Sequence, residues 1–101
     1  MAEREENDAT RITRVWLDNA EGLQREAERL TERAAGIGGT LEEQADGLAK
    51  NLKALISEHE MPDLGASLAG DLLAYAFEEI DFYSIARSYL ADFHDFRSRK
   101  K

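Results

Sequence analysis

The stretch GIGGTLEEQADGLAKNLKALI, residues 36–56, contains a turn signal, a helix start and an apolar stripe in succession. Its glycines predict the end of a preceding helix, because glycine adopts the left-handed conformation of a helix C-terminus at little steric cost. Thr40 and Glu43 have the spacing of a capping box, which predicts that a new helix starts here. Apolar residues then recur every three or four positions, at Leu41, Ala45, Leu48, Leu52 and Leu55. This spacing predicts an amphipathic helix.

The segment before the glycine turn has the same helical period. Its apolar residues are Ile12, Trp16, Ala20, Leu23, Ala27, Leu30 and Ala34, and we expect them to form one buried stripe. Asp18 and Glu21 have the spacing of a capping box. Two alternatives follow, namely one long helix or a short helix followed by a turn at Asp18. Either way, the glycine turn predicts an antiparallel pair of helices.

The C-terminal half predicts two more helices. Pro62 breaks the chain, because the residue before a proline is pushed out of the helical region. Residues 64–80 are apolar nearly all round, which predicts a central buried helix with Leu68, Leu72, Leu73 and Phe77 in the core. Asp81 is the predicted cap of a last, aromatic-rich helix from Phe82 to about Arg97. We therefore expect an all-α fold, a compact bundle of four helices, or five if the break at Asp18 is real.

The 101 residues fit a single domain, and we expect disorder only at residues 1–7 and 98–101. The chain has no cysteine, which excludes disulfides and thiolate chemistry. The N-terminal residues are charged and lack the apolar region of a secretory signal. The longest weakly charged stretch, residues 64–77, contains Asp71 and is too short to span a bilayer. These features predict a cytoplasmic protein with no membrane association.

The formal net charge is −8, and residues 58–95 contain nine acidic residues against one basic residue, Arg87. Such a surface repels nucleic acid, so we expect no direct DNA or RNA binding by the acidic body. It suits a protein partner with a basic or nucleic-acid-binding surface. The alternative is that the acidic charge serves only solubility.

No residue pattern indicates catalysis, a cofactor or a metal. His59 and His94 are flanked by carboxylates, but neighbouring residues of a helix point about 100° apart and do not converge on one ion. The chain has no His-Glu-x-x-His zinc motif and no Gly-x-Ser-x-Gly nucleophile elbow. The glycines at 36–39 follow a predicted helix rather than a strand and lack the Gly-Lys-Ser/Thr of a phosphate loop. We therefore expect a non-enzymatic protein.

Six residues are the candidate partner-binding set. Glu78, Glu79, Asp92 and Asp95 lie on or near the polar sides of their predicted helices and would contact a basic partner. Tyr83 and Leu90 lie beside the main apolar stripe of the last helix, where they would support self-association into a homodimer.

Two segments carry a resemblance. Residues 15–23, VWLDNAEGL, resemble a Trp-Leu-x-Asn-Asp-Glu-Gly-Leu-Tyr signature, and residues 71–86 resemble an Asp-Leu-Leu…Glu-Val-Asp-Trp-x-x-Ile-Ala segment. Both occur in small, acidic, helical proteins of bacteriophages and plasmids. The chain departs from the pattern at Ala20, Gln24 and Phe82, which stand where an acid, a Tyr and a Trp are usual.

The resemblance implies an accessory protein of a phage or plasmid. Together with the acidic body, it leads to the hypothesis of an inhibitor that binds a host defence or nucleic-acid-binding protein in the manner of a DNA mimic. The alternative is a structural helical domain that self-associates through its aromatic last helix.

Overall fold

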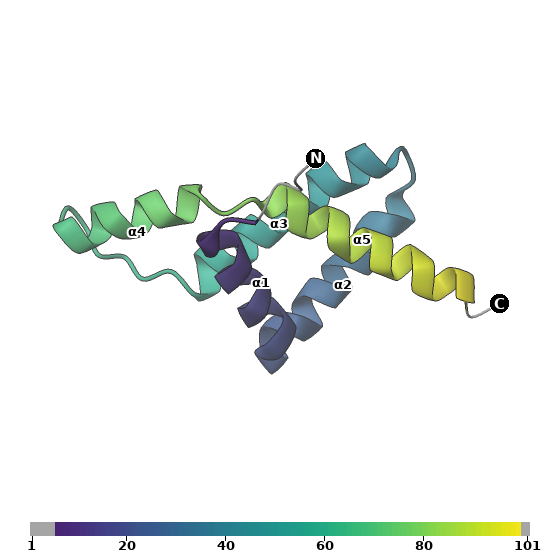
Figure 1. Cartoon of the computed structure of the whole chain (residues 1–101), viewed down its shortest axis with the longest axis horizontal. Helices are drawn as coiled ribbons and strands as arrows, with labels where there is room; N and C mark the ends of the chain where they lie inside the picture. The colour runs from purple at the N-terminus through teal and green to yellow at the C-terminus, as the bar shows by residue number, and fades with distance from the viewer. Residues whose placement is uncertain (1–5, 100–101) are drawn as a thin grey trace.

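The computed structural model describes residues 6–99, which form five α-helices (Figure 1). These are α1 (Asp8–Asn19), α2 (Glu21–Ile37), α3 (Leu41–His59), α4 (Leu68–Glu78) and α5 (Phe82–Arg99). No strand occurs in this part of the chain. The all-α prediction is confirmed, and of its two forms the structure has five helices rather than four.

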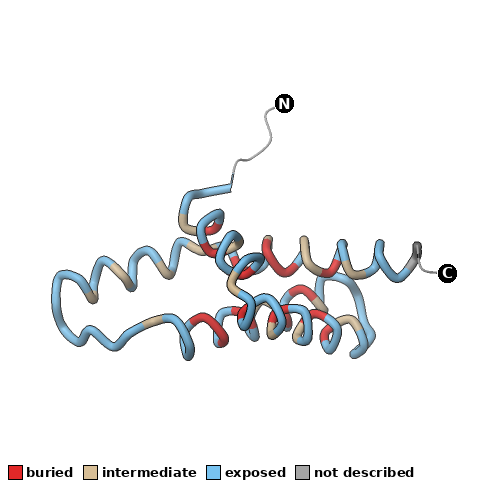
Figure 2. The backbone as a smooth tube through the Cα atoms, turned by 90° about the horizontal axis from the view of Figure 1, so that it is seen from below, coloured by how far each residue is buried: buried red, intermediate tan, exposed pale blue. Residues whose placement is uncertain are grey.

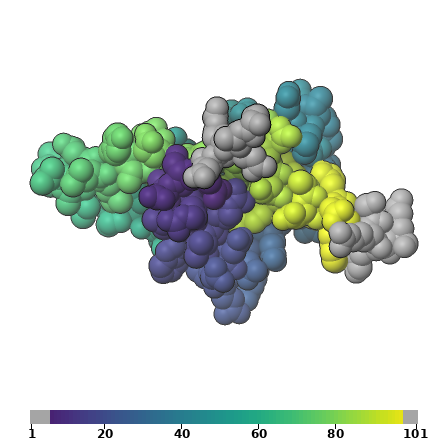
Figure 3. Space-filling view, in the orientation of Figure 1, coloured from purple at the N-terminus to yellow at the C-terminus, as the bar shows by residue number. Residues whose placement is uncertain are grey.

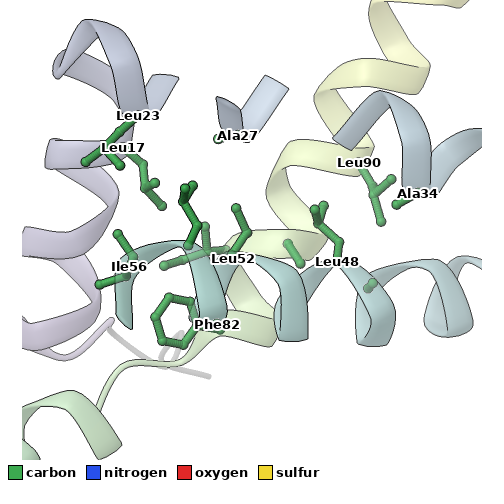
Figure 4. Close-up of a cluster of buried hydrophobic side chains, with 13 residues drawn as sticks. Leu17, Leu23, Ala27, Ala34, Leu48, Leu52, Ile56, Phe82 and Leu90 are labelled. Atoms are coloured by element: carbon green, nitrogen blue, oxygen red, sulfur yellow. The ribbon is translucent and has the colours of Figure 1, made fainter. Parts of the chain in front are cut away.

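The core is built around α3, which packs most extensively on α5 and also contacts α2. Leu48 and Leu52 of α3 and Ile85 and Leu90 of α5 are fully buried. Leu17 of α1, Leu23 and Ala27 of α2 and Phe82 at the start of α5 belong to the same cluster (Figure 4). The stripe predicted from residue 41 is therefore largely correct, since Ala45, Leu48, Leu52 and Leu55 are all buried. Its first member, Leu41, is 39 % exposed.

Two predicted helix caps are confirmed. The Thr40 hydroxyl accepts a hydrogen bond from the Glu43 amide, and the Glu43 carboxylate accepts one from the Thr40 amide, both at 3.0 Å. The Asp81 carboxylate accepts from the Ser84 amide at 3.0 Å at the start of α5. Gly38 and Gly39 have φ angles of 93° and 87°, the conformation that glycine allows between α2 and α3.

The predicted break in the first segment is real, but it lies at Ala20, two residues after Asp18. No side chain caps the start of α2, so the capping box expected from Asp18 and Glu21 is wrong. Glu21 instead pairs with Arg25 at 2.9 Å. The stripe predicted across residues 12–34 holds only within α2, where Leu23, Ala27 and Ala34 are buried.

Helix α1 buries polar residues and exposes apolar ones. Its buried residues are Thr10, Thr13 and Leu17, whereas Ile12 and Trp16 are 50 % and 59 % exposed. The prediction that Ile12 and Trp16 lie in the core is therefore wrong. The Thr13 hydroxyl donates to the Ala9 carbonyl at 2.8 Å, so its burial leaves no hydroxyl without a partner.

The prediction of a central helix over residues 64–80 is also wrong. Helix α4 starts only at Leu68, after the Ser67 cap, and none of its residues is buried. Leu68 and Leu72 are 76 % and 59 % exposed, while Leu73 and Phe77 are partly buried. Figures 1 and 3 show α4 projecting beyond the other four helices, and in Figure 2 its residues are coloured as exposed or intermediate. The apolar composition of α4 predicts burial, but among the described helices none packs extensively on it, and only the Phe77 end reaches the core.

Disorder was predicted for residues 1–7 and 98–101, and the structure describes only residues 6–7 and 98–99 of these two ends. Residues 1–5 and 100–101 lie outside the described residues. Asn7 caps α1 by accepting from the Thr10 amide at 2.8 Å, and Glu6 pairs with Arg14 at 2.6 Å. Helix α5 continues to Arg99. Among the described helices, none combines the length and the apolar character needed to cross a bilayer.

Thr10 fastens α1 to the segment between α4 and α5. Its hydroxyl accepts from the Asp81 amide at 2.8 Å and lies 3.5 Å from the Glu79 carbonyl, to which it can donate. The Asn7 side-chain amide donates to the same carbonyl at 2.8 Å. A buried hydroxyl therefore holds the N-terminus of the first helix at the start of the last.

We expect Thr10→Val to lower the free energy of unfolding by about 1–3 kcal/mol, because it leaves the Asp81 amide without its acceptor. Thr10→Ser keeps the hydroxyl and removes one buried methyl group, so it should cost about 1 kcal/mol or less. Urea denaturation followed by circular dichroism compares the two variants. A valine variant at least as stable as the serine variant would show that the hydroxyl does not fasten α1.

Candidate functional site

The four acidic residues of the predicted binding set are all exposed, but they do not form one cluster. Glu78 and Glu79 lie at the end of α4, next to the N-terminus of α1. Asp92 and Asp95 lie on the third and fourth turns of α5. The helical rise places the two pairs about 20 Å apart along the α5 axis. The fold therefore separates them into two patches.

The two apolar members of that set have different positions. Leu90 is fully buried in the core, so the expectation that it contacts a partner is wrong. Its position beside the aromatic stripe faces the core instead of solvent, because α5 packs on α3, α2 and α1. Tyr83 is 37 % exposed, and the Arg87 guanidinium lies 5.9 Å from its ring centre. Tyr83 thus remains accessible on the surface of α5.

One acidic residue of the set lines a groove between α2 and α5 that has a volume of about 570 Å³. Helix α2 contributes one turn of side chains to it and α5 contributes two. The lining residues are Glu28, Thr31, Glu32, Tyr89, Asp92, Phe93 and Phe96. Counted from Glu28 on α2 and from Tyr89 on α5, the other lining positions follow by three, four or seven residues, so they lie on one face of each helix. The groove exists because α2 and α5, distant in sequence, pack together.

The groove combines acidic and aromatic side chains. Glu28, Glu32 and Asp92 are exposed, and none of them forms an ion pair with another described residue. Phe93 is partly buried, and the Arg97 guanidinium lies 5.6 Å from its ring centre. An aromatic ring attracts a cation through its negative face, and nearby carboxylates add to the attraction. The groove is therefore suited to cationic side chains.

Tyr89 holds one end of the groove in place. Its hydroxyl donates to the Asp18 carboxylate at 2.7 Å, which ties α5 to the end of α1. Burial of the phenol raises the pKa of Tyr89 well above its usual value, and the hydrogen bond to Asp18 raises it further. Tyr89 is consequently a neutral donor at physiological pH. Asp18, expected from the sequence to cap a helix, has this bridging role instead.

Glu28 and Glu32 were not among the predicted site residues. Each is an ordinary exposed acid on the polar side of α2, and nothing in its local sequence distinguishes it from other acids of the helix. Only the packing of α2 beside α5 places them opposite Asp92. The residue spacing within one helix cannot predict which residues of another helix will lie opposite it.

The two histidines are both exposed, His59 at the end of α3 and His94 on α5. His94 lies 3.4 Å from the Gln44 side chain through its Nε2 atom. Across the described residues, no group of three or more His, Cys, Asp or Glu side chains is placed to hold a metal ion.

Comparison with protein families, curated proteins and solved structures gives no match to this chain.

Tyr89→Phe removes the hydrogen bond to Asp18, and we expect it to cost about 0.5–1.5 kcal/mol at neutral pH. The raised pKa also predicts a pH dependence. Unfolded tyrosine ionises near pH 10 while folded Tyr89 stays protonated, so its contribution is present below about pH 10 and is lost as the pH rises further. The stability gap between wild type and Tyr89→Phe should narrow above that pH.

Denaturant titrations at neutral and alkaline pH measure this gap. Tyr75→Phe removes an exposed phenol and is the control for loss of a hydroxyl group at neutral pH, where it should change stability by less than about 0.5 kcal/mol. A gap that widened with rising pH would contradict the assigned role of Tyr89.

Proposed function

We propose that this protein acts without catalysis, by binding a basic segment of another protein in the groove between α2 and α5. The observation that supports the proposal most is the groove itself, in which three acids without ion pairs to described residues surround aromatic side chains. Arginine or lysine side chains of the partner would contact Glu28, Glu32 and Asp92 and stack on Phe93 or Phe96.

The charge of the whole chain favours such a partner. The net charge of −8 attracts a basic protein over a distance and speeds the encounter at low ionic strength. The groove then provides short-range contacts that a diffuse negative charge lacks. Glu78, Glu79 and Asp95 lie outside the groove lining, so they would contribute to attraction rather than to the contact itself.

A nucleic-acid-binding protein is the class of partner that we propose. Such proteins present arginine and lysine side chains that neutralise phosphates, and carboxylates can occupy those same side chains. The resemblance of residues 15–23 and 71–86 to phage and plasmid proteins supports an accessory role, in which occupying a basic site inhibits a host protein. The proposal places this activity in the cytoplasm.

Fluorescence anisotropy with a labelled arginine-rich peptide tests the groove, and the same peptide with citrulline in place of arginine controls for the charge. We expect Glu28→Gln, Glu32→Gln and Asp92→Asn combined to weaken binding by about tenfold or more, because charge-assisted hydrogen bonds are lost. Phe96→Ala should weaken it further through the loss of ring contacts. Binding should also weaken steeply with added salt.

A matched variant removes the same number of charges elsewhere. Glu42, Glu58 and Asp63 are exposed and lie outside the groove, so Glu42→Gln, Glu58→Gln and Asp63→Asn combined should bind nearly as wild type. Equal weakening by both triple variants would mean that only net charge matters, and the groove would not be the site. Equal binding of the arginine and citrulline peptides would also contradict the proposal.

A further inference from the structure

Two helices expose apolar side chains on the faces that point away from the core. On α1, Ile12, Val15 and Trp16 are 50 %, 48 % and 59 % exposed, and we name these residues the outer face of α1. On α4, Leu68, Leu72 and Tyr75 are 76 %, 59 % and 68 % exposed, and we name these the free face of α4. Large contiguous apolar surfaces of this kind mark interaction sites in soluble proteins.

Both faces are consequences of the packing of their helices. Helix α1 turns Thr10, Thr13 and Leu17 inward, and the helical repeat then directs Ile12 and Val15 to the opposite side. Helix α4 directs Leu73 and Phe77 toward a cavity that it shares with residues 61–65. Its Leu68 and Tyr75 point to the opposite side, about half a turn from Leu73 and Phe77, and Leu72 lies beside them, about a third of a turn from Leu73.

The two faces do not cover each other within one chain. The hydrogen bonds of Asn7 and Thr10 to residues 79–81 place the N-terminus of α1 beside the end of α4. Figure 1 shows α4 extending away from α1 and from the other helices. Among the described helices, α1 has its substantial contacts with α2 and α5. The two helices therefore meet only where α1 begins and α4 ends, and the exposed apolar side chains of each face stay uncovered by the other.

We propose that a second copy of this chain covers them, with the free face of α4 of each copy packed on the outer face of α1 of the other. A two-fold axis makes this contact twice and leaves no apolar face open, which closes the assembly at a dimer. The helices match in length, since α1 has 12 residues and α4 has 11, or about 16–18 Å each. The inference is independent of the groove between α2 and α5.

The size of the exposed surface supports a dimer. The six residues of the two faces expose on the order of 700 Å² per chain, close to the roughly 800 Å² per partner that a stable interface buries. Because the chain carries a net charge of −8, association of two copies requires a contact area with few charges. The two faces meet this requirement, since their six members are uncharged.

One pair of charges that flank the two faces has opposite signs. Asp71 follows Leu68 on α4 by three residues and flanks the free face, whereas Arg11 precedes Val15 on α1 by four and flanks the outer face. Both residues are exposed, and Arg11 pairs only with the exposed Asp8 of its own helix among the described residues. Packing α4 on the partner's α1 can bring Asp71 to Arg11, whose own partner Asp8 lies on the same side of α1, whereas packing α4 on α4 would bring acids together with no base.

Sedimentation velocity of the full chain tests the proposal. We expect wild type to sediment at twice the chain mass of 11.4 kDa. Leu72→Glu and Trp16→Glu should each give monomers with unchanged helical circular dichroism, because both side chains are exposed in the single chain. Ile37→Glu is the matched control, since Ile37 is 78 % exposed at the end of α2 and lies on neither face. It should remain dimeric.

Two further measurements identify the pairing. A mixture of Trp16→Glu and Leu72→Glu chains retains one intact contact per dimer, so it should associate more strongly than either variant alone. Arg11→Glu should weaken the dimer, and Arg11→Glu combined with Asp71→Arg should restore it. A monomeric wild type, a dimer that ignores the face variants, or a mixture no better than its components would overturn the proposal. A monomer that binds phosphatidylcholine vesicles would assign the faces to a membrane instead.

Discussion

The packing of α3 against α5 is the constraint on which the rest of the structure depends. Leu48 and Leu52 meet Ile85 and Leu90 in a fully buried cluster, and this contact places the end of α3 near the start of α5. Residues 60–81 must therefore leave the core and return to nearly the same place. Helix α4 forms inside this excursion, where no other helix of the chain can cover it. Its apolar composition is the consequence that most needs an explanation, and association with a second copy provides one.

The same packing creates the groove. Because α5 lies on α3, its other flank rests against α2, and Asp92 comes to face Glu28 and Glu32 across aromatic side chains. The hydrogen bond from Tyr89 to Asp18 then fixes α5 relative to α1. The two proposed surfaces thus use different parts of the molecule, one acidic and concave, the other apolar and projecting. A dimer of this kind would present two grooves to a partner, which would strengthen binding to a partner with repeated basic segments.

Local signals predicted local features well. Thr40 with Glu43 and Asp81 were identified as caps, because a cap depends on residues within one turn. The predicted apolar stripe does not continue across the break at Ala20, because a new helix begins there with a different rotation about its axis. Helix α1 therefore buries Thr10 and Thr13 in place of Ile12 and Trp16. Hydrophobicity predicted that α4 would be the central buried helix, which is wrong, because the packing of α3 on α5 leaves the segment between them outside the core. Glu28 and Glu32 were missed because only the contact of α2 with α5 distinguishes them.

Hydrogen exchange at two protein concentrations tests this account most directly, because it reports on α3, α5 and α4 in the same experiment. The account predicts that amides around Leu48–Leu52 and Ile85–Leu90 are the most protected at both concentrations. Amides of α4 should exchange quickly in dilute solution and gain protection as the concentration rises and the dimer forms. Protection of α4 equal to that of α3 and independent of concentration would contradict the account, since α4 would then belong to the core of the single chain.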